Sequence, residues 1–135
     1  MIPNIDPSQI YPVKAQINPQ SIAAAGNATS AWTQVPVNSK WLYVVLNAGA
    51  LGGGSEQIDV LQATSSGGAN SKALSTGLIS AVTTNNGTTT AVLDLEKNMD
   101  INNGFNFVQI KVTNTGGTGA LVGASAIFGP AAFVG

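Results

Sequence analysis

Residues 105–113 read Phe-Asn-Phe-Val-Gln-Ile-Lys-Val-Thr, a stretch in which apolar and polar side chains alternate from Val108 onward. Successive side chains of a β-strand point to opposite faces, so a period of two predicts a strand with one buried face. The aliphatic residues of one face are Val108, Ile110 and Val112. We expect them in the core and place Phe105 and Phe107 on the opposite face, where Phe107 is a candidate contact residue.

The same period recurs on both sides of this stretch, and glycine-rich segments separate the repeats. Glycine supplies the positive φ angles that turns require. No segment gathers helix-forming residues at helical spacing over three turns. Strands are predicted near Ala31–Val37, Trp41–Ala48, Gln57–Thr64, Lys72–Thr83, Thr89–Glu96, Phe105–Thr113 and Ala120–Phe128. Short strands at this spacing predict an all-β fold, a single antiparallel β-sandwich or jelly-roll-like domain over residues 21–135.

Residues 1–20 differ from the rest of the chain because they hold four of its six prolines. Proline fixes φ and removes an amide donor, which predicts an extended segment and excludes a helix. Its apolar side chains need a surface to lie on, and the candidate contact residues among them are Ile2, Ile5, Ile10 and Tyr11. Two interpretations stay open: an N-terminal arm that reaches a neighbouring subunit, or a strand that begins the domain's own sheet.

The amino-acid composition excludes most kinds of enzyme catalysis. The 135 residues include no cysteine, no histidine and no arginine, so thiolate or imidazole catalysis and structural zinc sites are excluded. Charged residues make up 8% of the chain and the net charge is -1, which argues against nucleic acid as a partner. No secretory signal or membrane-spanning run is visible, so we expect synthesis in the cytoplasm and no membrane partner.

Carboxylates offer two further candidate sites. Asp94, Glu96, Asn98 and Asp100 alternate like calcium-loop ligands, but the glycine and the twelfth-position carboxylate of such a loop are missing. We therefore expect a solvent-facing strand end, with no metal and no cofactor. Glycoside hydrolysis would need two facing acids, and the spacing marks no pair. The remaining acids, Asp6, Glu56 and Asp59, are expected to be solubilising charges, and the chain is expected not to be an enzyme.

Aromatic residues are the remaining candidates for a binding site. Trp41 and Tyr43 fall on one face of a predicted strand that is apolar on both faces, which is typical of a central strand or of one covered by another subunit. With Trp32 and Tyr11 they could form a platform for stacking a sugar ring. Aromatic residues of small β domains are more often core or interface anchors, so we expect Trp41 and Tyr43 to be subunit or partner contacts.

The order of the central and C-terminal segments resembles that of small virion structural proteins of tailed bacteriophages, and most of all their capsid decoration, or cement, proteins. The resemblance covers about residues 40–130 and depends on strand order and a few polar positions. The segments that carry it are Glu56–Thr64, Gly67–Lys72, Ala91–Leu95, Met99–Phe105, Val108–Thr113 and Ile127–Pro130.

This resemblance implies a non-enzymatic β-sandwich that self-associates, commonly as a trimer, on the outer surface of the virion capsid. Its partner there would be the major capsid protein, whose neighbouring subunits it would clamp after the shell expands. A neutral surface rich in hydroxyl and amide groups is compatible with many modest contacts to a lattice. Two alternatives remain open: a phage tail, fibre or head-spike domain, and a carbohydrate-binding module.

Overall fold

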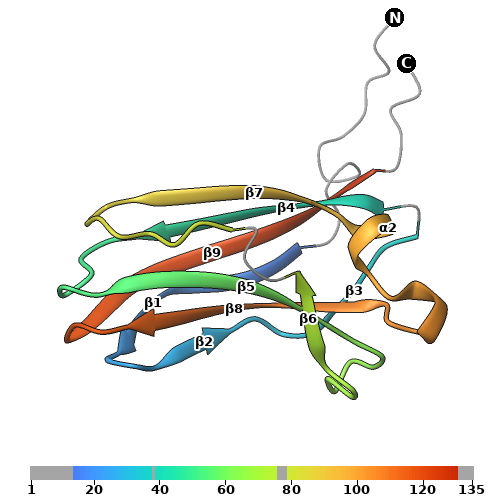
Figure 1. The fold of residues 1–135 in the computed structure, drawn as a ribbon, viewed down its shortest axis with the longest axis horizontal. Coiled ribbons are helices and arrows are strands. Elements are labelled where there is room, and N and C mark those ends of the chain that lie inside the picture. Colours follow the sequence, from blue (N-terminus) through green and yellow to red (C-terminus); the bar gives the residue numbers. More distant parts are fainter. Residues whose placement is uncertain (1–13, 38, 76–78, 131–135) are drawn as a thin grey trace, which may run out of the picture.

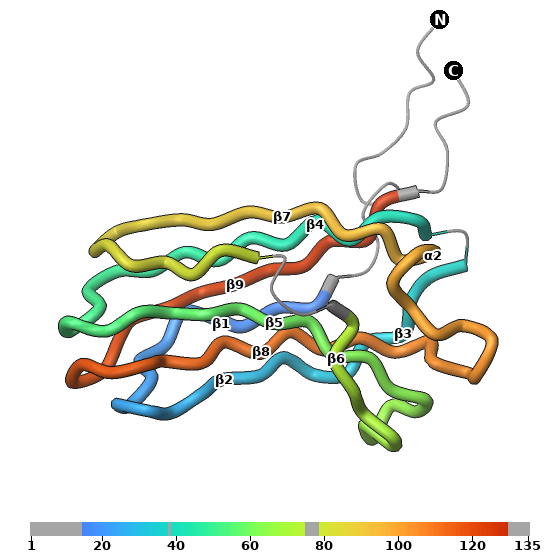
Figure 2. The backbone as a smooth tube through the Cα atoms, in the orientation of Figure 1, coloured from blue at the N-terminus to red at the C-terminus, as the bar shows by residue number. Residues whose placement is uncertain are grey.

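The computed structural model describes residues 14–37, 39–75 and 79–130, which form two antiparallel sheets packed face to face (Figures 1 and 2). Sheet A has the order β1-β9-β4-β7, and its strands are β1 (Lys14–Ala23), β9 (Gly119–Pro130), β4 (Ser39–Ala48) and β7 (Thr88–Asp94). Sheet B has the order β2-β8-β5-β6, with β3 also on β8, and its strands are β2 (Asn27–Thr29), β3 (Thr33–Gln34), β8 (Phe107–Thr115), β5 (Ser55–Ala63) and β6 (Lys72–Ser75). The predicted all-β sandwich is confirmed.

Alternation explains why these residues form this core. Val108, Ile110 and Val112 on β8 are fully buried, as predicted, and face inner residues of sheet A such as Leu42 and Val44 on β4. Burying an aliphatic side chain of this size contributes about 1.5–3 kcal/mol relative to leaving it exposed. In sheet A, β4 and β9 are the two central strands, and both bury nearly every residue of their inner face.

β1 settles part of the open question about the N-terminal segment. Residues 14–23 form an outer strand of sheet A that pairs with β9, and the register shifts between Ile17 and Gln20, around Pro19. Proline has no amide hydrogen, so an outer strand or a bulge is where a sheet tolerates it. The interpretation as a first strand therefore holds for residues 14–20. Ile2, Ile5, Ile10 and Tyr11 lie outside the described residues.

Several predicted strand limits were wrong. The prediction of a strand over Lys72–Thr83 corresponds to β6 and, after it, a single bridge between Val82 and Glu56. Over Ala31–Val37 only β3 pairs with β8. Leu95–Asn98 form the short helix α2, because the Asp94 side chain accepts a hydrogen bond from the Lys97 amide and caps it. The 3-10 helix η1 (Ile101–Asn103) follows.

Phe105 was assigned to the wrong face by the simple alternation. It precedes β8, is buried and belongs to the core cluster. The period of two fails here because the chain is not yet a strand at residue 105. Lys72 lies with its ammonium nitrogen 4.3 Å from the centre of the Phe105 ring and covers it from the solvent side.

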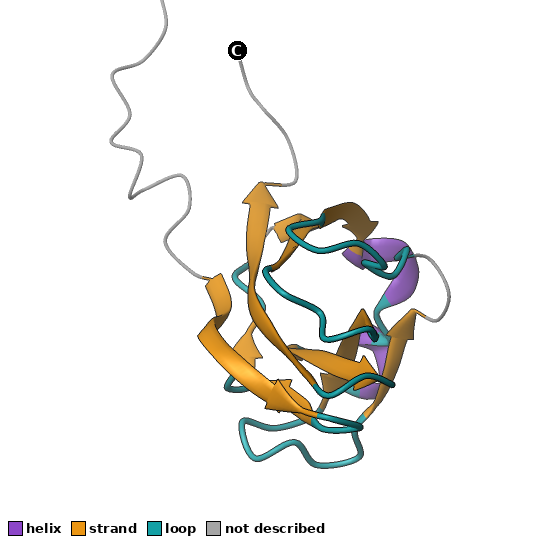
Figure 3. Cartoon of the chain, turned by 90° about the vertical axis from the view of Figure 1, so that its left-hand side faces the viewer, coloured by secondary structure: helices purple, strands orange, loops and turns teal. Residues whose placement is uncertain are grey.

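Glycine turns close the end of the sandwich that Figure 3 presents to the viewer. The turns at residues 51–54 and 116–119 pack backbone against backbone, and the Thr118 amide donates to the Gly52 carbonyl at 3.1 Å. Gly117 has a φ of +67°, and a methyl group there would lie 2.6 Å from both the Gly52 oxygen and the Gly54 nitrogen. Only glycine permits this close approach.

Replacing Gly117 with alanine is therefore expected to destabilise the fold by more than replacing Gly53. Gly53 has a φ of +87° but no atom within 4 Å of its missing Cβ, so Gly53→Ala adds mainly the strain of a left-handed backbone, about 1 kcal/mol. Gly117→Ala adds the steric clash to this strain. Chemical denaturation followed by tryptophan fluorescence measures both, and equal losses in the two variants would contradict the packing of these turns.

Candidate docking surface

The outer face of sheet A carries a row of apolar side chains across its strands. Tyr43 on β4 lies opposite Val92 on β7 and opposite Ile127 on β9. Trp41 is 39% exposed, Tyr43 44% and Val92 57%, while Ile127 and Val45 beside them are half-buried. The prediction that Trp41 and Tyr43 share one face of a strand is confirmed, and β4 is a central strand of its sheet.

Trp41 stands at the end of this row and is exposed to about the same extent as Tyr43. Its cross-strand neighbours are Asp94 and Gly129, and Gly129 has no side chain to pack against the indole. The Lys40 ammonium nitrogen lies 5.2 Å from the centre of the Trp41 ring and 3.9 Å from a carboxylate oxygen of Glu96. An exposed cation–π contact of this kind contributes about 0.5–1 kcal/mol. The indole is therefore oriented but still accessible.

Polar neighbours of the row are uncharged along most of the face. Ser125, Thr90 and Asn47 alternate with the apolar residues, and Asp94 is the one carboxylate among the described outer residues of β4, β7 and β9. Aromatic residues surrounded by uncharged polar groups are typical of protein interfaces, which are depleted of charge at their centres. We define the sheet A face by Trp41, Tyr43, Val45, Val92 and Ile127.

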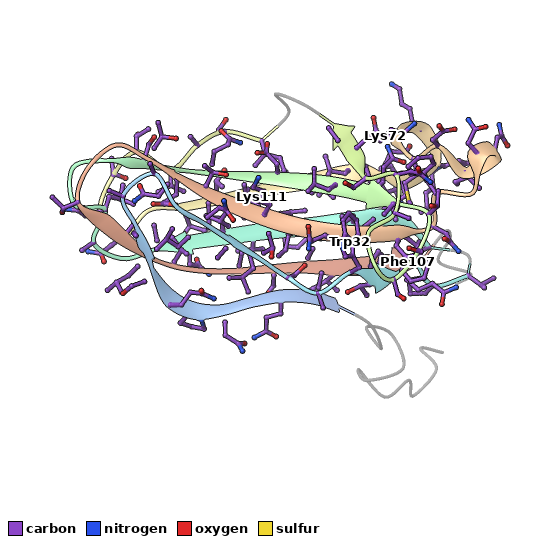
Figure 4. All side chains as sticks on the ribbon, turned by 90° about the horizontal axis from the view of Figure 1, so that it is seen from below. Trp32, Lys72, Phe107 and Lys111 are labelled. Carbon is purple, nitrogen blue, oxygen red and sulfur yellow. The ribbon has the colours of Figure 1, made fainter. Side chains whose placement is uncertain are left out.

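The other predicted aromatic contacts do not join this face. Phe107 lies on β8 in sheet B, opposite Ala63 on β5 and Gln34 on β3, and it is half-buried. Trp32 also belongs to that side, and Figure 4 shows it near Phe107. A methyl group on Gly68 would lie 2.5 Å from the indole nitrogen of Trp32, so the 65–70 loop covers this ring. A single platform of Trp32, Trp41 and Tyr43 is therefore wrong; Tyr11 lies outside the described residues.

The carboxylates with calcium-like spacing are engaged by the protein itself. Asp94 caps α2, and Asp100 accepts hydrogen bonds from the Lys72 ammonium at 2.6 Å and from the Asn103 amide at 2.8 Å. The Lys72 hydrogen bond, followed by that of Asn103, lowers the pKa of Asp100 below its usual value. Within the described residues no group of three potential acidic, histidine or cysteine metal ligands comes together.

Glu56 is the functional group that sequence reasoning misplaced. It was expected to be a solubilising charge, yet its side chain is 0% exposed and faces the core from β5. Its backbone pairs in both directions with Val82, so its cross-strand relation to Asn114 on β8 is of the closer, non-hydrogen-bonded type. Among the described residues, neither carboxylate oxygen of Glu56 has a hydrogen-bond partner, and the side-chain oxygen of Asn114 has none either.

The protonated form of Glu56 suits this position best. Burial without an ion partner raises its pKa, because desolvation penalises the charged form. A protonated carboxyl can donate to the Asn114 side-chain oxygen, whose amide nitrogen already donates to the Ala23 carbonyl at 3.1 Å. The sequence does carry a signal for this burial, because Glu56 alternates in phase with the buried Ile58 and Val60. The prediction of a solubilising charge followed the residue type and not this period of two.

Surface hollows lie at both ends of the sandwich. Two flank Leu121 and a third lies beside Met99 and Phe105, and their linings among the described residues contain no titratable side chain.

No helix in the described part of the chain combines the length and the apolar character needed to cross a membrane. Comparison with protein-family models and with curated proteins gave no match.

Replacing Glu56 with glutamine is expected to stabilise the protein at pH 7. With a folded-state pKa above the ordinary value of 4.5, Glu56 contributes stability that is fully present below that value and is lost as pH rises through the raised pKa. The loss has a slope of at most about 1.4 kcal/mol per pH unit. The difference in unfolding free energy between Glu56→Gln and wild type, measured by denaturation from pH 4 to 8, should therefore grow with pH.

Taking this difference cancels the contributions of other groups, including Asp100. Asp59→Asn is the matched control, because it removes one carboxylate from the solvent side of the same strand, and it is expected to change stability by no more than about 1 kcal/mol. A Glu56→Gln protein less stable than wild type at pH 7 would contradict a protonated, unpaired Glu56.

Proposed function

We propose that this chain is a non-enzymatic structural protein of a virus particle that binds the outer surface of the capsid through the sheet A face. The observation that carries the proposal is the exposed row of Trp41, Tyr43 and Val92 on a sandwich whose core is already complete without it. Accessible aromatic rings on a regular, rigid sheet are the anchors from which interfaces are built. The partner follows from the resemblance to capsid decoration proteins.

The physical character of the surface supports a lattice as the partner. The described outer residues of sheet A form a small, almost uncharged patch, which suits a contact of modest strength per copy. Copies that bind a repeating shell and also bridge neighbouring capsid subunits gain stability from multivalency rather than from any single contact. Such a protein needs no reactive group, and the hollows described above offer no titratable lining.

The alternatives make different demands on the same face. A tail, fibre or head-spike domain would use it in few copies per particle. A carbohydrate-binding module would stack a sugar on Trp41 and Tyr43, which do lie on one face. Titration with sugars would then quench tryptophan fluorescence in wild type and not in Trp41→Ser, whereas protein docking predicts no such quenching in either protein.

Removing both rings from the sheet A face is expected to weaken capsid binding. Trp41→Ser with Tyr43→Ser should lower affinity by about 30-fold or more, because the loss of even one central aromatic anchor typically costs about 2 kcal/mol and such losses are not additive. Cosedimentation with purified capsids that lack this protein measures the loss. Phe107→Ser, which removes a ring from the outer face of sheet B, is the control and should bind like wild type. Binding lost only in Phe107→Ser would move the contact to sheet B.

Deleting residues 1–12 tests the N-terminal contact residues separately. The truncated domain keeps all the described strands, from β1 to β9, and is expected to stay soluble and folded. If Ile2, Ile5, Ile10 and Tyr11 anchor an arm on a capsid subunit, the truncated protein should no longer cosediment with capsids. Circular dichroism checks the fold. Unchanged capsid binding by the truncated protein would contradict a contact between this arm and the capsid.

A further inference from the structure

The outer strands of the two sheets differ in how well they resist pairing with another chain. β1 carries Pro19 and a register shift, β6 is four residues long with a register shift in its pairing, and β2 and β3 have three and two residues. Short strands, bulges and proline are the devices that keep sheet edges from associating. Each of these outer strands therefore has such a device.

β7 has none of them. Its seven residues, Thr-Thr-Thr-Ala-Val-Leu-Asp, contain no proline and no lysine, and they pair with β4 in an unbroken register from Thr88 to Asp94. Within the described part of the chain, β7 is the last strand of sheet A and bonds to β4 alone. A regular strand of this kind is a template for a further strand.

The hydrogen-bond pattern shows which backbone groups of β7 are free to do this. The Ala48 amide donates to the Gly87 carbonyl at 2.9 Å, and the β4–β7 register continues through this pair. Backbone groups alternate sides along a strand, so Thr89, Ala91 and Leu93 bond to β4. The amides and carbonyls that face away from β4 belong to Thr88, Thr90, Val92 and Asp94. Of these, the Asp94 carbonyl already accepts a hydrogen bond from the Asn98 side-chain amide at 2.8 Å.

We propose that β7 pairs with β7 of a second copy of this chain, antiparallel and around a two-fold axis beside Ala91, to make one continuous sheet from two copies of sheet A. Centring the pairing on Ala91 opposes Thr90 with Val92 of the second copy and Thr88 with its Asp94. All four outward-facing residues then meet outward-facing partners, and the whole strand is used. A shift by one residue in either direction leaves an end of β7 unpaired.

Charge selects the same arrangement. Asp94 is the one charged residue of β7, so antiparallel pairing places the two Asp94 carboxylates at opposite ends of the new ladder. Parallel pairing in register would set them side by side, which is unfavourable. A second copy of β7 thus matches the first in length, offers it partners for the free groups of Thr88, Thr90 and Val92, and brings no like charges together. The pairing is isologous and gives a dimer, which differs from the trimer that the resemblance implies.

Thr90→Pro tests this pairing without disturbing the sheet itself. The Thr90 amide faces away from β4, so proline removes a donor only from the free side, where outer strands tolerate it. Sedimentation velocity of the full chain up to millimolar concentration should show a concentration-dependent dimer for wild type and for Thr90→Ala. Thr90→Pro should weaken the dimer by about tenfold, because one donor is lost from each copy. A monomeric wild type, or equal association of all three proteins, would overturn the proposal.

Cysteine substitution tests the register and remains informative if proline perturbs the fold. The chain has no cysteine, so Ala91→Cys introduces a single thiol beside the two-fold axis, opposite its own copy. Mild oxidation should give a disulfide-linked dimer. Thr88→Cys is the control, because its thiol is more exposed but lies opposite Asp94, far from its copy. Faster cross-linking of Thr88→Cys than of Ala91→Cys would contradict the register.

This test does not depend on the capsid. Dimerisation is measured on the free chain and capsid binding on purified particles, so either proposal can fail while the other holds. A trimer that persists in Thr90→Pro would show that self-association uses a different surface.

Discussion

Mutual burial of two sheet faces is the constraint on which the rest of this structure depends. Each inner face is built from aliphatic residues at alternate positions, and neither sheet could stand alone in water with that face exposed. Because the core is formed by the inner faces, residues on the outer faces are not required for it. Trp41 and Tyr43 are therefore not needed to complete the core, and the proposed contact with a partner protein would account for their exposure.

The same constraint explains the cost of the polar exceptions. Glu56 and Asn114 lie on the inner side of sheet B at the end closed by the glycine turns, where burial is complete and partners are few. An unpartnered buried polar group is destabilising, and a buried charge more so. At the other end, buried Gln62 has partners: its side-chain oxygen accepts from the Asp100 amide at 2.8 Å and its amide donates to the Ala73 carbonyl at 3.1 Å. That end is correspondingly better satisfied.

The period of two was enough to predict the fold class, the buried face of β8 and the shared face of Trp41 and Tyr43. It failed where the chain stops being a strand, as at Phe105 and at the capped helix after Asp94. It also could not show that a loop covers Trp32, because that contact joins residues far apart in the sequence. The free side of β7 was beyond sequence reasoning for the same reason, since strand order is set by long-range pairing.

The most direct test of a lattice role is the number of copies of this chain in the particle. Quantitative mass spectrometry of purified virions from the source lysate gives that number relative to the major capsid protein. A ratio near one, or a simple fraction of it, is what a protein bound across the capsid surface predicts. A handful of copies would place the chain at a vertex, neck or tail, and its absence from the virion would contradict a structural role in the particle.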